Sequence, residues 1–138
     1  MRRPALIACS TLLATASLSA CSSEMHSPDA PDDLPPVRVT GAAENCISTR
    51  NIRDTRVQSD RVIDFEITGG RVYRNTLPNR CPGLGFERAF SYDTTIGRLC
   101  NPEIIYVLRE TAGTIERGAG CAIGNFVPVE YTGADRVN

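Results

Sequence analysis

This sequence of 138 residues contains no lysine and only one histidine. The histidine, His26, lies in a proline-rich stretch away from the strand-like patterns. A folded domain without histidine has no Ser-His-Asp or Cys-His catalysis and no imidazole ligand for a metal. We therefore expect a protein that is not an enzyme and that carries no metal or other cofactor.

The first twenty residues resemble a bacterial lipoprotein signal peptide. Arg2 and Arg3 are followed by an apolar stretch over 5–16, which is too short to span a bilayer as a helix. Leu18-Ser19-Ala20-Cys21 resembles the lipobox, in which the cysteine is acylated before cleavage. We expect residues 1–20 to be removed and Cys21 to attach the protein to a membrane. The alternative is an ordinary secretory signal that happens to contain a cysteine.

The predicted cleavage changes the net charge of the chain, and the residue after Cys21 indicates a location. Without Arg2 and Arg3, 13 of the 15 arginines remain against 16 acidic residues, which argues against nucleic acid as a partner. The exclusive use of arginine suits bidentate anion binding, but we attribute it to codon usage. Ser22, rather than aspartate, follows the lipidated cysteine and favours the outer membrane, with the domain facing the periplasm.

Of the six cysteines, Cys9 would leave with the signal peptide and Cys21 would carry lipid, so four remain: Cys46, Cys81, Cys100 and Cys121. An even number in an exported chain predicts two disulfides. Of the three pairings, we favour the nested one, Cys81–Cys100 inside Cys46–Cys121, because the outer bond would join the two ends of the domain. A zinc site with four cysteines is the alternative, but no two of them have the C-x₂₋₄-C spacing.

The pattern of prolines and apolar residues divides the rest of the chain. Residues 22–43 are rich in Pro, Ser and Asp and predict a disordered tether. Residues 44–131 predict a single domain, and 132–138 a flexible tail. Short strands at about ten-residue spacing, with no sustained helical period, predict a small antiparallel barrel or sandwich of about 5–7 strands. The expected strands are 52–58, 61–68, 71–77, 88–93, 103–109 and 121–127, with a short helical turn as an option for 44–51.

One hairpin carries the strongest local signal. Ile63, Phe65 and Ile67 alternate with acidic residues, and Gly69-Gly70 follows. A two-residue loop would place Phe65 opposite Arg74, which conflicts with an apolar inner face. Either Arg74 extends across that face or the register differs, and both options stay open.

Carboxylates are the remaining catalytic option. Asp64 and Glu66 share the outer face of this strand and Asp60 lies near them, so a hydrolase using these residues is conceivable. Acidic residues on the outer face of a strand are usually solubilising surface, and this is the interpretation we adopt.

The segment Cys81-Pro82-Gly83-Leu84-Gly85-Phe86 is the most distinctive loop. It lacks the Gly-Lys-Ser/Thr ending of a phosphate-binding loop, and a strand rather than a helix is expected after it. We interpret it as a tight turn fixed by a disulfide, with Leu84 and Phe86 packed inward. Four polar or aromatic residues nearby could form the rim of a binding patch: Tyr73, Arg74, Asn75 and Arg80.

Taken together, several motifs resemble a family of small uncharacterised lipoproteins of sphingomonad-type alphaproteobacteria. They are Asn45-Cys46-Ile47, the run from Gly69 to Pro78, the 81–86 loop, Leu99-Cys100 and Cys121 to Phe126. The resemblance covers nearly the whole domain and departs at Ala122, where glycine is expected. The family is a domain of unknown function, so the resemblance implies lipidation and four domain cysteines, but no activity.

Two functional hypotheses follow. The first is a non-enzymatic, membrane-anchored envelope module that binds an envelope protein or another envelope component. The second is an inhibitor of an envelope-attacking enzyme such as a lysozyme, which rests on similarity of layout alone.

Overall fold

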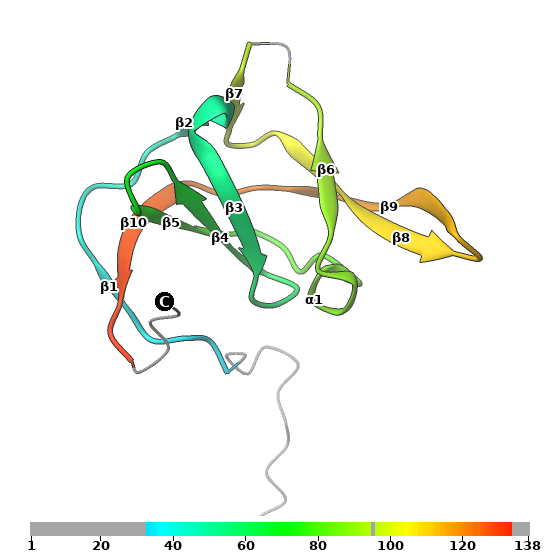
Figure 1. Ribbon diagram of the computed structural model, residues 1–138, viewed down its shortest axis with the longest axis horizontal. Coiled ribbons are helices and arrows are strands. Elements are labelled where there is room, and N and C mark those ends of the chain that lie inside the picture. Colours follow the sequence, from blue (N-terminus) through cyan, green and yellow to red (C-terminus); the bar gives the residue numbers. More distant parts are fainter. Residues whose placement is uncertain (1–32, 95, 134–138) are drawn as a thin grey trace, which may run out of the picture. The chain divides into compact units, whose positions relative to one another are not determined.

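The computed structural model describes residues 33–94 and 96–133. The fold is mainly β and antiparallel, as the sequence predicts (Figure 1). The described residues contain ten strands, more than the 5–7 expected: β1 (Val37–Val39), β2 (Cys46–Ser48), β3 (Ile52–Val57), β4 (Val62–Ile67), β5 (Val72–Thr76), β6 (Phe90–Tyr92), β7 (Arg98–Cys100), β8 (Ile104–Thr111), β9 (Thr114–Ala122) and β10 (Phe126–Tyr131). Two short helices, η1 (Thr49–Asn51) and α1 (Leu84–Glu87), complete the described elements.

The strands form three sheets. The largest has the order β1-β10-β5-β4-β3, a second pairs β2 with β7, and a third has the order β6-β8-β9. No closed barrel forms among these strands, since β1 and β3 are the edges of the five-stranded sheet. The chain ends of the domain meet at the β1–β10 pair, where Val37 lies opposite Tyr131.

Strand β1 corrects the predicted start of the domain. The sequence assigns residues 22–43 to a disordered tether, but 37–39 pair with β10, and Thr40 donates its backbone N–H to the Pro128 carbonyl. Short pairing of this kind leaves almost no apolar periodicity, so composition alone does not reveal it. Residues 1–32 and 134–138, including Cys21 and His26, lie outside the described residues.

The core lies between the five-stranded sheet and the other two sheets. Phe65 of β4 makes edge-to-face contacts with Phe126 of β10 and Phe90 of β6, with ring centroids 5.4 and 6.1 Å apart. Ile63, Phe65 and Ile67 all point into the core, as their alternation predicts. Leu84 from α1 is fully buried in the same cluster.

The β4–β5 hairpin resolves the conflict around Arg74. Its loop has three residues, Thr68 to Gly70, because the Ile67 N–H bonds to the Arg71 carbonyl. Both glycines have positive φ, which the turn requires. The register is one residue away from the two-residue-loop option, so Phe65 faces Tyr73 and Arg74 faces Asp64 on the opposite side of the sheet.

Two disulfides are present, as predicted, but the nested pairing is wrong. Cys46 bonds to Cys100, and Cys81 bonds to Cys121, so the two links cross in sequence. The reason is strand pairing: β2 and β7 are neighbours with Cys46 directly opposite Cys100, at a Cα–Cα distance of 4.0 Å. The ends of the domain are joined by the β1–β10 pair instead of a disulfide.

Candidate functional site

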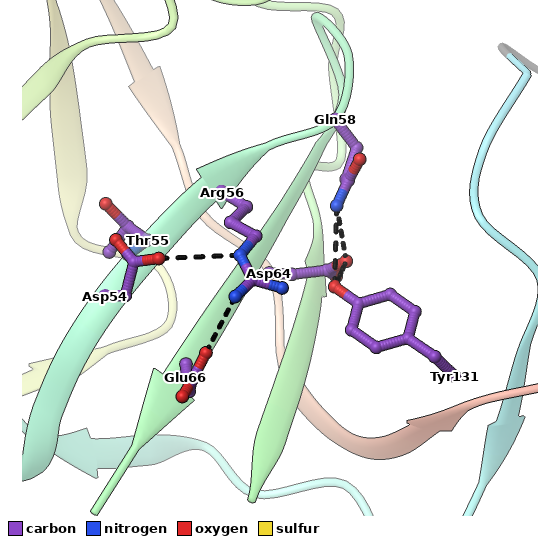
Figure 2. A network of polar contacts seen from close by, with 7 residues as sticks. All are labelled: Asp54, Thr55, Arg56, Gln58, Asp64, Glu66 and Tyr131. Carbon is purple, nitrogen blue, oxygen red and sulfur yellow. Dashed lines mark hydrogen bonds and ion pairs between the residues drawn. The ribbon is translucent and has the colours of Figure 1, made fainter. Parts of the chain in front are cut away.

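Asp64 lies in a polar network on the outer face of the five-stranded sheet, and Figure 2 shows it joined to Gln58 and Tyr131. Its carboxylate accepts hydrogen bonds from Arg74 Nε and Nη2, both at 2.8 Å, from the Tyr131 hydroxyl at 2.7 Å and from Gln58 Nε2 at 3.0 Å. Arg74 Nε donates to Oδ1, and the other three donors converge on Oδ2. Asp64 is therefore the shared acceptor that joins Arg74, Tyr131 and Gln58.

Burial of this network contradicts the expectation of a solvated strand face. The Asp64 side chain is 1% exposed and that of Arg74 is 12% exposed. The hydrogen bond to Asp64 is the main cause that raises the pKa of Arg74, so the guanidinium keeps its charge. Arg74 also donates to the Pro35 carbonyl at 3.2 Å, so the pair fastens the chain before β1 onto the sheet.

The other two candidate carboxylates are also paired with arginine. Glu66 accepts from Arg56 at 3.0 Å on the more open part of the same face. Asp60 lies away from them, in the turn before β4, where it binds Arg80 at 2.9 Å and accepts the Gly85 N–H at 2.7 Å. Each of these contacts is electrostatic or structural, and none leaves an acid–base pair facing a common ligand.

The four residues predicted to form a binding rim do not lie together. Arg74 faces outward into the Asp64 network, while Asn75 is fully buried on the opposite face and forms two 2.8 Å hydrogen bonds with the Gly124 backbone. Arg80 lies in the loop that leads to α1. Tyr73 is buried, and it lines a surface hollow. Their closeness in sequence is lost because β5 alternates sides.

That hollow lies between the segment joining β1 to β2 and the β4–β5 turn, and has a volume of about 610 Å³. At its base the Tyr73 hydroxyl donates a 2.6 Å hydrogen bond to Glu44 Oε1. This bond, with burial, raises the pKa of Tyr73 and keeps the phenol neutral. Arg71 and Glu130 add one charge of each sign to the wall. We name it the Tyr73 hollow.

The Tyr73 hollow borders a second one of about 290 Å³ beside the Cys46–Cys100 disulfide, because Glu44, Arg71 and Tyr73 line both. Glu44 is a site residue that the sequence does not single out. It comes from the boundary of the predicted tether, and no spacing or alternation connects it with Tyr73, 29 residues later.

The 81–86 loop only partly matches its prediction. Cys81 is fixed by a disulfide and Leu84 is buried, as expected, but Phe86 is 87% exposed and not packed inward. The reason is α1, a helical turn absent from the prediction, which orients successive side chains about 100° apart and directs only Leu84 to the core.

Within the described ranges, no three or more His, Cys, Asp or Glu side chains converge in a way that could hold a metal ion. None of the helices in those ranges has the length and hydropathy needed to cross a membrane. Comparison of the chain with protein-family models, curated proteins and solved structures finds no match.

Proposed function

We propose that this protein is a lipid-anchored, non-enzymatic binding module of the bacterial cell envelope. The observation that carries the proposal is the pair of disulfides, which indicates an oxidising, extracytoplasmic compartment. The lipobox-like run ending at Cys21 supports acylation there, and Ser22 supports the periplasmic face of the outer membrane. More than one acyl chain on Cys21 would give stable anchoring.

Two features of the domain support binding rather than catalysis. The carboxylates of Asp60, Asp64 and Glu66 each form an ion pair with an arginine, an arrangement that favours a structural role over general acid–base chemistry. The Tyr73 hollow, in contrast, is lined by a hydroxyl, a carboxylate and a guanidinium beside the β4–β5 turn. Its volume falls within the range of about 300–1,000 Å³ typical of binding sites. We propose that it contacts an envelope protein.

Anchoring is tested by metabolic labelling with a palmitate analogue in a bacterial host that expresses the full chain. We expect the label and membrane association to be lost in Cys21→Ser. Cys9→Ser is the matched control, because Cys9 lies in the segment that would be removed, and it should keep both. Label that persists in Cys21→Ser would contradict the proposal.

Binding is tested in the same cells with a photo-reactive amino acid. Placed at Arg71, in the wall of the Tyr73 hollow, it should yield a discrete crosslinked species. Placed at exposed Arg53 on β3, away from the hollow, it should not. Identical crosslinking at both positions, or none at Arg71, would count against this hollow as the contact surface.

A second function, inhibition of an envelope-attacking enzyme such as a lysozyme, is favoured by the β8–β9 hairpin. This hairpin projects from the body of the domain, and residues 109–117 at its tip are all exposed (Figure 1). Ile115 is 68% exposed there, a shape that could enter an enzyme cleft. The purified protein should then slow lysozyme, and Ile115→Asp should abolish the effect. Unchanged lysozyme activity would remove this function.

A further inference from the structure

A separate hollow of about 380 Å³ lies between the β3–β4 turn and the loop that leads into α1. Its wall includes the polar residues Gln58, Ser59, Asp60 and Arg80, together with the aromatic residue Phe86. It shares no lining residue with the Tyr73 hollow. We name it the Phe86 hollow.

Contacts of the preceding residues hold the backbone that leads to Phe86. The Cys81–Cys121 disulfide fixes the start of the loop, and Leu84 is fully buried. Asp60 binds the Gly85 N–H at 2.7 Å, immediately before Phe86. A Cβ on Gly85 would lie 3.1 Å from the Asp60 side chain, so glycine permits this close contact. These contacts hold the backbone that leads to Phe86, and the Phe86 side chain is 87% exposed.

The charges of the Phe86 hollow select for a neutral ligand. Arg80 Nη2 lies 2.9 Å from Asp60 Oδ2, so the one cation and the one anion of the wall neutralise each other. A phosphate would meet the Asp60 carboxylate, and a cation would meet the Arg80 guanidinium. A neutral molecule with hydroxyl groups, however, can donate to Asp60 and accept from Arg80 together.

We propose that the Phe86 hollow binds a neutral sugar ring of an envelope glycan. The ring of Phe86 has a negative face, which attracts the weakly positive C–H groups on one side of a sugar. Asp60 and Arg80 hydrogen-bond to the sugar hydroxyls at its edge. The volume, near the lower end of the usual range, fits a small ligand or one unit of a longer chain.

The sugar site rests on the proposed function in one respect only: a location in the cell envelope, where the domain would meet glycans. Peptide binding is less well supported, since a peptide anchor needs an apolar pocket and this wall is polar. Insertion of Phe86 into a lipid bilayer is also less well supported, because Asp60 and Glu87 would approach the bilayer with it.

The chain contains no tryptophan, so Phe86→Trp creates a single fluorescent reporter that retains a stacking surface. The full chain carrying this change, purified in detergent, is titrated with the soluble trimer of N-acetylglucosamine. We expect saturable changes in emission. Ile115→Trp, on the exposed β8–β9 tip, is the matched control and should not respond. Equal responses from both positions, or none from position 86, would overturn the proposal.

Sedimentation with insoluble peptidoglycan provides a second measurement. Phe86→Ala should weaken binding at least about tenfold, which corresponds to about 1.4 kcal/mol, whereas Phe86→Tyr should not. If the emission of the Phe86→Trp variant responds only to vesicles of phosphatidylethanolamine and phosphatidylglycerol, a membrane contact replaces the sugar site. Neither measurement requires lipid on Cys21, so failure of the anchoring proposal leaves this test valid.

Discussion

Replacing Asp64 with asparagine is expected to lower the free energy of unfolding by about 3–5 kcal/mol, since removing one partner leaves the Arg74 guanidinium buried without its counter-ion. Asparagine also offers an NH₂ group where donors from Tyr131 and Gln58 converge. A domain of this size has a total stability of about 5–15 kcal/mol, so the loss is a large part of it. The measurement is urea unfolding followed by circular dichroism, with both disulfides oxidised.

Two comparisons make this prediction specific. Glu66→Gln breaks a pair whose Arg56 side chain is 41% exposed, and it should cost less than about 1 kcal/mol. The double change Asp64→Leu with Arg74→Met removes both charges and should recover most of the stability lost in Asp64→Asn. If Asp64→Asn costs no more than Glu66→Gln, the buried pair does not hold the sheet as described.

Three further predictions concern pH, backbone conformation and close packing. The pKa of Tyr131 is raised, mainly by burial and also by the hydrogen bond to Asp64. The neutral phenol therefore stabilises the fold below pH 10, and this contribution is lost as the pH rises through the folded-state pKa. Tyr131→Phe should accordingly flatten the decline in the urea midpoint above pH 10. Ala112 has a φ of 51° in the β8–β9 turn, a conformation that glycine adopts more easily. Ala112→Gly should therefore raise the free energy of unfolding by about 0.5–1 kcal/mol, which is measured as a higher thermal midpoint. A Cβ on Gly124 would lie 2.2 Å from the Thr76 carbonyl oxygen, so Gly124→Ala should destabilise the domain by more than about 2 kcal/mol in chemical denaturation. Gly133→Ala, whose Cβ would lie 3.2 Å from the Pro36 side chain, should cost much less. The three arguments would be contradicted, respectively, by a steeper alkaline loss of stability in Tyr131→Phe, by a lowered thermal midpoint in Ala112→Gly, and by equal stability of the two glycine variants.

Local patterns predicted the fold class and the β4–β5 hairpin because alternation reports directly on which side chains are buried. They did not predict strand β9, since Gly118 and Gly120 look like loop residues. In the sheet these positions leave room for the side chains of Arg109 and Tyr106 from the neighbouring strand. That accommodation depends on β8 lying alongside, which no local window contains.

The sites were harder to predict than the strands, for a related reason. Asp64 was expected to be solvated because its strand alternates, but a partner from β5 and a tyrosine from β10 cover it. The disulfide pairing likewise depends on β2 and β7 being neighbours, 54 residues apart. The contact of Glu44 with Tyr73 and the exposure of Phe86 depend on the folded arrangement of the segments around them. Contacts between distant segments therefore decide what each surface can bind.

The mass of the intact protein purified from membranes tests the central proposal most directly. We expect a chain that begins at an acylated Cys21 and gains the mass of four hydrogens on reduction, two for each of its disulfides. After digestion without reduction, the peptide that contains Cys46 should remain joined to the peptide that contains Cys100. An unacylated chain that keeps residues 1–20, or one with four free thiols, would contradict the account of a lipid-anchored envelope protein.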